Sequence, residues 1–298
     1  MSRKATAAAS RISAQYQREP RIVMTWKRLR TNIGAIIGLV ILLALILAMF
    51  YSFIFISYND ITKIDGKNRF APPSAEHPFG TDEMGRDLFK RCIYGSRYSV
   101  AIAFGAVTIG LIIGVFFGSI SGYFGGWVDQ LIMRLTDIIA SIPGTLLGMV
   151  IMTILGARLI NLMIAVGVSA VSGFIRLSRA SVLTVRSNEY VESARAIGMS
   201  EFRIIFTQVL PNSISPLIVF ATSRMATAVL SAAGLSFLGF GVAVPKPEWG
   251  ALISGSRTYL QHAPHLCYFP GLCIMAMAFA CALLGDGLRD ALDPKLNK

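Results

Sequence analysis

The chain has 298 residues, of which 54% are hydrophobic and only 15% are charged, and its formal net charge is +12. This composition lies far from that of soluble globular domains and is typical of a protein embedded in lipid. The basic residues are dispersed along the edges of apolar segments, so the positive charge fits anionic lipid headgroups and nucleic acid is not expected as a partner.

Uncharged runs of roughly 18 residues or more, long enough to cross a bilayer, recur along the sequence. Two of these runs are separated only by Arg224, and we interpret them as one span that starts after Pro211, because proline fits a first helical turn but breaks an interior. The chain is therefore predicted to be an all-α polytopic membrane protein with six transmembrane helices. The predicted spans cover residues 33–56, 99–122, 130–155, 160–177, 213–237 and 266–284.

The placement of Lys and Arg orients the predicted helices. The larger share of these residues falls on the side of the N-terminus, which predicts that both termini are cytoplasmic (N-in/C-in). The first apolar run is too long for a signal peptide and lacks a cleavage site, so it is expected to remain as a span. The resulting domains are a basic cytoplasmic tail (1–32), a first transmembrane helix (33–56), an extracytoplasmic loop (57–98), a five-helix core (99–286) and a cytoplasmic tail (287–298).

The extracytoplasmic loop contains a candidate amphipathic helix. Thr81 can cap it, two acids follow in its first turn, and Lys90 and Arg91 stand at its end, which complements the helix dipole. Leu88 and Phe89 give it an apolar side. We predict a helix that lies flat on the outer membrane face.

Glycines recur at every fourth position of the second predicted span, at Gly110, Gly114 and Gly118. In a helix these positions form one stripe, and small residues at this spacing let another helix approach closely within lipid. The stripe predicts either a tight contact in a moving bundle or ordinary packing inside one subunit.

A polar stretch, residues 187–211, separates the fourth and fifth predicted spans on the cytoplasmic side. Its first part has good helix formers and early acids, Gly198 follows as a natural stop, and Ser200 can cap a second short helix that ends before Pro211. Small residues leave a low-profile surface on the first helix. Such a helix suits docking to a soluble partner, or it rests on lipid headgroups as a connector. Candidate docking residues are Tyr190, Glu192, Ser193, Ala194, Arg195 and Gly198.

This stretch resembles the "EAA" loop of bacterial ABC importer permeases, which forms the coupling helix that docks into the ATPase subunit. Ser193 replaces the usual first alanine and Gln208 the usual apolar residue. The positions that match the pattern are Glu192, Ala194, Gly198, Leu210 and Pro211.

Three further segments narrow the resemblance to the peptide and nickel importers. Residues 79–87 are similar to the "GTDxxGRD" segment of those permeases, and residues 235–250 to a second shared segment. Residues 285–295 are close to the ending of the C-type permease of dipeptide and oligopeptide systems. The chain is thus identified as a member of this family, which implies the type I importer permease fold and a bacterial cytoplasmic (inner) membrane location.

The resemblance also implies a machine with several subunits. A second, B-type permease would complete the pore, two ATPase subunits would bind underneath, and an extracytoplasmic substrate-binding protein would deliver a di- or oligopeptide. The chain has no phosphate-binding G-x-x-x-x-G-K-[ST] segment, so no cofactor is expected in it, and ATP and Mg would be held by the partner ATPases. Import of nickel or another peptide-like solute is the alternative.

Arg224 stands near the middle of the fifth predicted span, where a charge is expected to face a cavity or a partner. We expect one of three roles: it lines the pathway and attracts a peptide carboxylate, it pairs with an acid of the neighbouring permease, or its long side chain snorkels to the membrane interface. Relatives often carry an acid before residue 235, where this chain has Ser231, a second pathway candidate. No catalytic or metal-binding arrangement stands out, which disfavours a membrane enzyme, and no intramembrane acid points to an ion-coupled secondary carrier.

Overall fold

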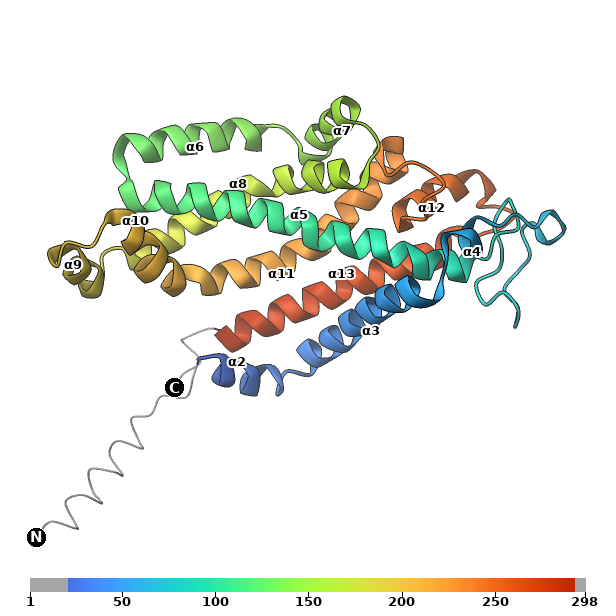
Figure 1. Cartoon of the computed structure of the whole chain (residues 1–298), viewed down its shortest axis with the longest axis horizontal. Helices are drawn as coiled ribbons and strands as arrows, with labels where there is room; N and C mark the ends of the chain where they lie inside the picture. Colours follow the sequence, from blue (N-terminus) through green and yellow to red (C-terminus); the bar gives the residue numbers. More distant parts are fainter. Residues whose placement is uncertain (1–20, 293–298) are drawn as a thin grey trace, which may run out of the picture.

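The computed structural model describes residues 21–292, a bundle of long helices packed side by side with shorter helices at both ends (Figure 1). Within that range the only β pairing is one isolated antiparallel bridge, between Thr81 and Asp87. The α-helices are α2 (Arg21–Leu29), α3 (Ile33–Phe55), α4 (Tyr58–Thr62), α5 (Leu88–Phe124), α6 (Gly126–Ser141), α7 (Gly144–Leu155), α8 (Leu159–Val185), α9 (Glu189–Ala196), α10 (Glu201–Ile204), α11 (Leu210–Leu235), α12 (Trp249–Ser256) and α13 (His265–Leu292).

Five helices of the described range are long and apolar enough to cross a membrane: α3, α5, α8, the continuous helix Glu201–Phe240 and α13. A sixth span exists if α6 and α7 are counted as one, but they meet at a bend of 88°. The predicted span over residues 130–155 is therefore formed by two helices that meet at this bend, and not by one continuous helix. Pro143 lacks an N–H and forces the preceding Ile142 into extended backbone (φ −89°, ψ 125°), which ends α6.

The predicted amphipathic helix after Thr81 is also wrong. Helix α5 begins at Leu88, and its cap is Asp87, whose carboxylate accepts the Lys90 N–H at 2.9 Å. Thr81 instead anchors the loop, because its hydroxyl accepts the Ala71 N–H at 2.8 Å. Leu88 is 1% exposed, so this segment extends a membrane-spanning helix into the core and does not lie flat on the membrane.

Asp82 organises the turn that precedes α5. It accepts two backbone N–H groups of the turn, at 2.9 and 3.0 Å, and its other oxygen accepts Arg86 Nε at 2.7 Å and pairs with Arg91. All three charged side chains are buried. At Gly85 (φ +74°) an added Cβ would lie 1.7 Å from the Asp65 carbonyl oxygen, so this position requires glycine.

The fifth predicted span is longer than expected, because no break occurs before Pro211. The helix runs from α10 through a π-helical turn, Ile205–Val209, into α11. A π turn shifts the hydrogen-bond register, so the missing N–H of Pro211 does not interrupt the helix. Helix α10, the last part of the polar stretch, is thus continuous with the helix that crosses the membrane.

The glycine stripe of α5 packs against α8 of the same chain. An added Cβ at Gly114 would lie 2.2 Å from Phe174 Cβ, and one at Gly118 would lie 2.5 Å from the Ile175 carbonyl oxygen. Gly110 faces Gly167 in the same interface. The two helices approach so closely because these positions lack side chains.

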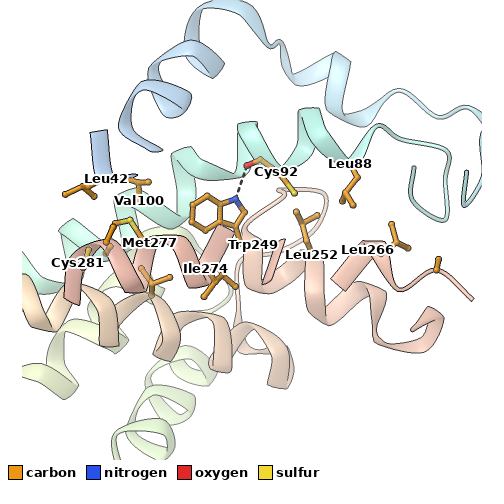
Figure 2. Close-up of a cluster of buried hydrophobic side chains, with 14 residues drawn as sticks. Leu42, Leu88, Cys92, Val100, Trp249, Leu252, Leu266, Ile274, Met277 and Cys281 are labelled. Carbon is orange, nitrogen blue, oxygen red and sulfur yellow. Dashed lines mark hydrogen bonds between the residues drawn. The ribbon is translucent and has the colours of Figure 1, made fainter. Parts of the chain in front are cut away.

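Trp249 fixes the short helix α12 to the bundle. It is 1% exposed and its Nε1–H donates to the Cys92 carbonyl oxygen of α5 at 2.9 Å, inside a cluster of apolar side chains from α3, α5, α12 and α13 (Figure 2). Buried indole N–H groups require such a partner. Helices far apart in the sequence are joined here.

The elements divide between two ends of the bundle. Helices α2, α9 and α10 and the C-terminal end of α13 lie toward one end, and α4 and α12 lie toward the other (Figure 1). This division agrees with a topology in which both termini and the polar stretch share a side. Of the predicted tails, residues 1–20 and 293–298 lie outside the described residues, while α13 continues past the predicted boundary at 287 to Leu292.

Candidate functional site

Helix α9 forms the projecting part of the polar stretch, and it ends as the sequence predicts. Gly198 adopts φ +85° just after the helix. Its N–H donates to the Arg195 carbonyl at 3.0 Å, and the Met199 N–H donates to the Ala194 carbonyl at 3.1 Å. These two bonds form a Schellman cap, for which glycine is strongly favoured.

One face of α9 is fixed to the bundle. Val191 is fully buried and Ala194 is 6% exposed. They belong to a cluster that contains Val182 of α8 and Ile204 of α10. The prediction that Ala194 contributes to a low-profile outer surface is therefore wrong: its small side chain serves the contact between α9 and its own bundle.

The opposite face of α9 is exposed, and we call it the outer α9 face. Ile197 is 80% exposed at the end of the helix. Ile197 was not singled out from the sequence; its signal was an apolar side chain directly before the capping glycine. The exposed residues of this face are Glu192, Ser193, Ala196 and Ile197, with Tyr190 and Arg195 at its edges.

A polar network ties α9 to α10 and α5. Arg195 Nε lies 3.2 Å from Glu201 Oε1, and Arg195 Nη2 donates to the Tyr123 hydroxyl at 3.0 Å. The Tyr123 hydroxyl also bonds to Glu201, and Arg186 Nη1 donates to the Gly122 and Tyr123 carbonyls at 2.9 and 3.1 Å. Tyr123 and Glu201 were missed by sequence reasoning, since they are far apart in the chain and neither belongs to a motif.

A second ion pair holds α6 against α8 near the same end of the bundle. Arg179 of α8 contacts both carboxylate oxygens of Asp129 of α6 along one guanidinium edge, with Nε 2.5 Å from Oδ1 and Nη2 2.7 Å from Oδ2. This two-pronged geometry fixes direction as well as distance. The first turn of α6 is therefore coupled to α8, and α8 leads directly into α9.

Arg224 and Ser231, the two predicted pathway residues, line one small cavity between α5, α8 and α11. Its volume is about 80 Å³. The guanidinium of Arg224 lies over the Phe220 ring, 4.5 Å from its centroid. The residues that line the cavity are Ala106, Val107, Val166, Ser169, Ala170, Arg224, Thr227, Ala228 and Ser231.

Within residues 21–292, no carboxylate lies within ion-pair distance of Arg224. Gly173 of α8 lies beside it, since an added Cβ there would lie 3.4 Å from Arg224 Nη2. In the described part of the chain, Arg224 of α11 therefore has no acidic partner.

The bend between α6 and α7 lies beside this cavity. Ser169, which lines the cavity, donates its hydroxyl to the Gly144 carbonyl at 3.2 Å. Ile142, Pro143 and Gly144 are all exposed on the chain. No side chain caps the first turn of α7, so its leading backbone N–H groups remain open.

The described residues contain no group of three or more His, Cys, Asp or Glu side chains arranged to hold a metal ion. His265 Nε2 lies 3.3 Å from the Thr81 carbonyl, where it joins α13 to the outer loop.

Comparison with protein families gives two matches along the chain. A family described as "Binding-protein-dependent transport system inner membrane component" matches residues 114–298. A second, described as "N-terminal TM domain of oligopeptide transport permease C", matches residues 22–73. Together they cover the first helix and most of the bundle.

Curated relatives are similar over nearly their whole length. The chain is 45% identical to the dipeptide transport system permease protein DppC of Alkalihalophilus pseudofirmus, with 91% of this chain and 89% of that protein covered. It is 39% identical to the glutathione transport system permease protein GsiD of Pectobacterium atrosepticum, with 91% and 90% covered.

Among solved structures, a chain of the MetNI methionine ABC transporter in an inward-facing conformation is similar in fold. The TM-score is 0.55 at 18% sequence identity, and the match covers 68% of this chain and 97% of that chain. At this identity the likeness concerns the fold alone, and it agrees with the importer permease fold expected from the sequence.

Proposed function

The chain belongs to the family of binding-protein-dependent transport system inner membrane components, and from this premise we propose that it lines the pathway for di- or oligopeptides and receives the work of ATP hydrolysis through α9. It is a permease subunit of an ABC importer in the bacterial inner membrane, and it is a transport subunit, not an enzyme. ATP hydrolysis in such importers belongs to a partner ATPase.

The peptide substrate is supported by the names of the relatives. One curated relative is a dipeptide permease and others are glutathione permeases, and glutathione is itself a small peptide. Nickel or another peptide-like solute is the second candidate, because residues 79–87 are similar to a segment found in nickel as well as peptide importer permeases. Among residues 21–292, no side-chain cluster favours a metal substrate over a peptide.

The partners follow from the same family. A B-type permease would pack beside the bundle, two ATPase subunits with ATP and Mg would bind at the end that carries α9, and an extracytoplasmic binding protein would bind at the other end. Nucleotide binding closes the ATPases, α9 moves with them, and the bundle switches access as a rigid body. Gly110, Gly114 and Gly118 keep α5 and α8 together during this movement.

One observation supports the docking role: α9 buries Val191 and Ala194 in its own bundle while the outer α9 face remains exposed. A helix that packs against its own bundle on one side and is exposed on the other can transmit the movement of a bound partner to the bundle without unfolding. Its Schellman cap and the bond network at Arg195 add rigidity where force would enter. We assign Tyr190, Glu192, Ser193, Arg195 and Gly198 to this joint, with Arg224 and Ser231 in the pathway.

The docking role is tested by Glu192→Lys in the assembled importer. Glu192 is exposed on the outer α9 face, so the change spares the core and reverses a charge at the proposed contact. ATPase subunits should no longer copurify with the permease, and peptide uptake should stop. Glu76→Lys, a charge reversal at another exposed glutamate, in the outer loop, is the control and should keep ATPase association. Normal association and uptake in the Glu192→Lys complex would overturn the proposal.

A further inference from the structure

We propose that Arg224 and the bend between α6 and α7 form one binding site for a carboxylate of the transported solute. The proposal rests on the transport function above and adds the chemical group that the pathway recognises. It follows from three features at or beside the cavity between α5, α8 and α11: a cation with no acidic partner among residues 21–292, an open helix start and a set of hydroxyl groups.

The first feature is the cation. Arg224 is half-buried in a membrane-spanning helix, and a charge at that depth is retained where it faces a cavity, water or an opposite charge. Its contact within the described chain is the Phe220 ring, which holds the guanidinium by its face and leaves its N–H edge free. A guanidinium edge matches a carboxylate through two parallel hydrogen bonds.

The second feature is the bend. Backbone that leaves the helix at membrane depth persists only where protein covers it or where it lines a water-filled space. Residues 142–144 are exposed on the chain, and the 12-residue helix α7 starts there without a side-chain cap. Open N–H groups at a helix start carry partial positive charge and favour an anion.

Helix α8 brings these two features together. Ser169 lines the cavity of Arg224 and also bonds to the Gly144 carbonyl at the start of α7. One turn further along α8, Gly173 lies against the Arg224 guanidinium. The cation and the helix start therefore lie along the same side of α8, with hydroxyl groups of Ser169, Thr227 and Ser231 around them.

The ligand class follows from the charges. Arg224 is the one charged side chain that lines the cavity in the described chain, so an ammonium group would meet repulsion while a carboxylate would meet donors. A volume of about 80 Å³ suits a single functional group and not a whole peptide. The site thus selects solutes that present a free carboxylate, with the rest of the molecule outside the cavity.

The charge preference can be measured with Thr227→Cys in the complete importer, after the four native cysteines are replaced by serine. Thr227 is exposed, lines the cavity and lies one turn from Arg224. Each rate is first divided by the rate at which the same reagent modifies a small free thiol. On this scale the thiol introduced by Thr227→Cys should react at least about fivefold faster with an anionic methanethiosulfonate than with a cationic one of similar size. The added change Arg224→Met should bring this ratio to about one, and Arg224→Lys should preserve it.

Leu230→Cys is the matched control, since Leu230 is exposed on the same helix but does not line the cavity. The ratio of the anionic to the cationic rate at the Leu230→Cys thiol should be the same with and without Arg224→Met. A Thr227→Cys thiol that does not react, or whose ratio is unchanged by Arg224→Met, would overturn the site.

Protection by ligands separates this inference from the proposed function. A dipeptide should slow the reaction of the Thr227→Cys thiol by several-fold, and the same dipeptide with a C-terminal amide should not. If acetate protects but the dipeptide does not, the carboxylate site stands and the peptide substrate is wrong. Equal protection by dipeptide and amide contradicts the site and leaves the peptide function intact.

Discussion

Arg195 of α9 and Glu201 of α10 face each other across the glycine turn, with Nε and Oε1 3.2 Å apart. Both side chains are about half exposed, so water screens the pair and it adds little to stability. Its importance is positional: it joins the helix proposed to meet the ATPase to the helix that crosses the membrane. Tyr123 of α5 completes the contact by bonding to both.

The pair should matter for coupling more than for folding. Arg195→Glu places two acids together and should reduce ATP-driven uptake several-fold, while the thermal midpoint changes by only a few degrees, because the lost pair is exposed. The reversed pair Arg195→Glu with Glu201→Arg should recover part of the uptake. Uptake and ATPase rate in proteoliposomes measure this. Equal uptake in the single and reversed variants would show that the pair transmits nothing.

Ile197 should act as an apolar contact for the ATPase. Ile197→Asp introduces a charge where we expect a partner to bury an isoleucine, so ATPase copurification should fall at least about tenfold. Val244 is 82% exposed near the opposite end of the bundle, compared with 80% for Ile197, and Val244→Asp provides a control of equal exposure. If the two variants retain ATPase equally, the outer α9 face is not the contact.

Gly114 and Gly234 should respond to alanine in opposite directions. At Gly114 the new Cβ would lie 2.2 Å from Phe174 Cβ, and separating α5 from α8 should cost about 1–3 kcal/mol. At Gly234 nothing lies within 4 Å, so alanine should be neutral or stabilising by up to about 1 kcal/mol through helix propensity. Thermal unfolding of the purified complex measures both, and equal midpoints would show that the α5–α8 contact tolerates a wider spacing.

Glu248 should make the outer end of the bundle sensitive to pH. It is 2% exposed and caps α12, accepting Gly250 and Ala251 N–H groups at 2.9 and 2.8 Å and the Ser236 hydroxyl at 2.8 Å. Burial raises the pKa of this carboxyl above its ordinary value of 4.5, although these hydrogen bonds lower it. The folded protein thus holds this proton more tightly than the unfolded chain does.

Stability from this group is therefore present below the ordinary carboxyl pKa and decreases as the pH rises through the raised folded pKa. Glu248→Gln removes the titration and turns an amide N–H₂ toward donors, which should cost about 1–3 kcal/mol at low pH. The difference in thermal midpoint between wild type and this variant should shrink as the pH rises. A difference that stays constant with pH would show that Glu248 does not titrate in this range.

Local patterns in the sequence predicted several features correctly. Uncharged runs located the apolar helices, and a glycine after good helix formers located the end of α9, because bilayer thickness and αL backbone are local requirements. The Thr81 prediction failed for a physical reason: Thr81 and Asp87 both suit a cap, and the tertiary contacts of Asp82 with Arg86 and Arg91 decide where α5 begins.

A bundle of membrane helices with one polar helix held at its end could be read from the amino acids alone, since hydrophobicity, charge bias and capping act over a few neighbouring residues. Packing in three dimensions was needed to show which face of α9 is free, that α6 and α7 bend beside Arg224, and that Tyr123 meets Arg195 and Glu201. These relationships join residues up to about eighty positions apart. They depend on how whole helices pack, which no local pattern encodes.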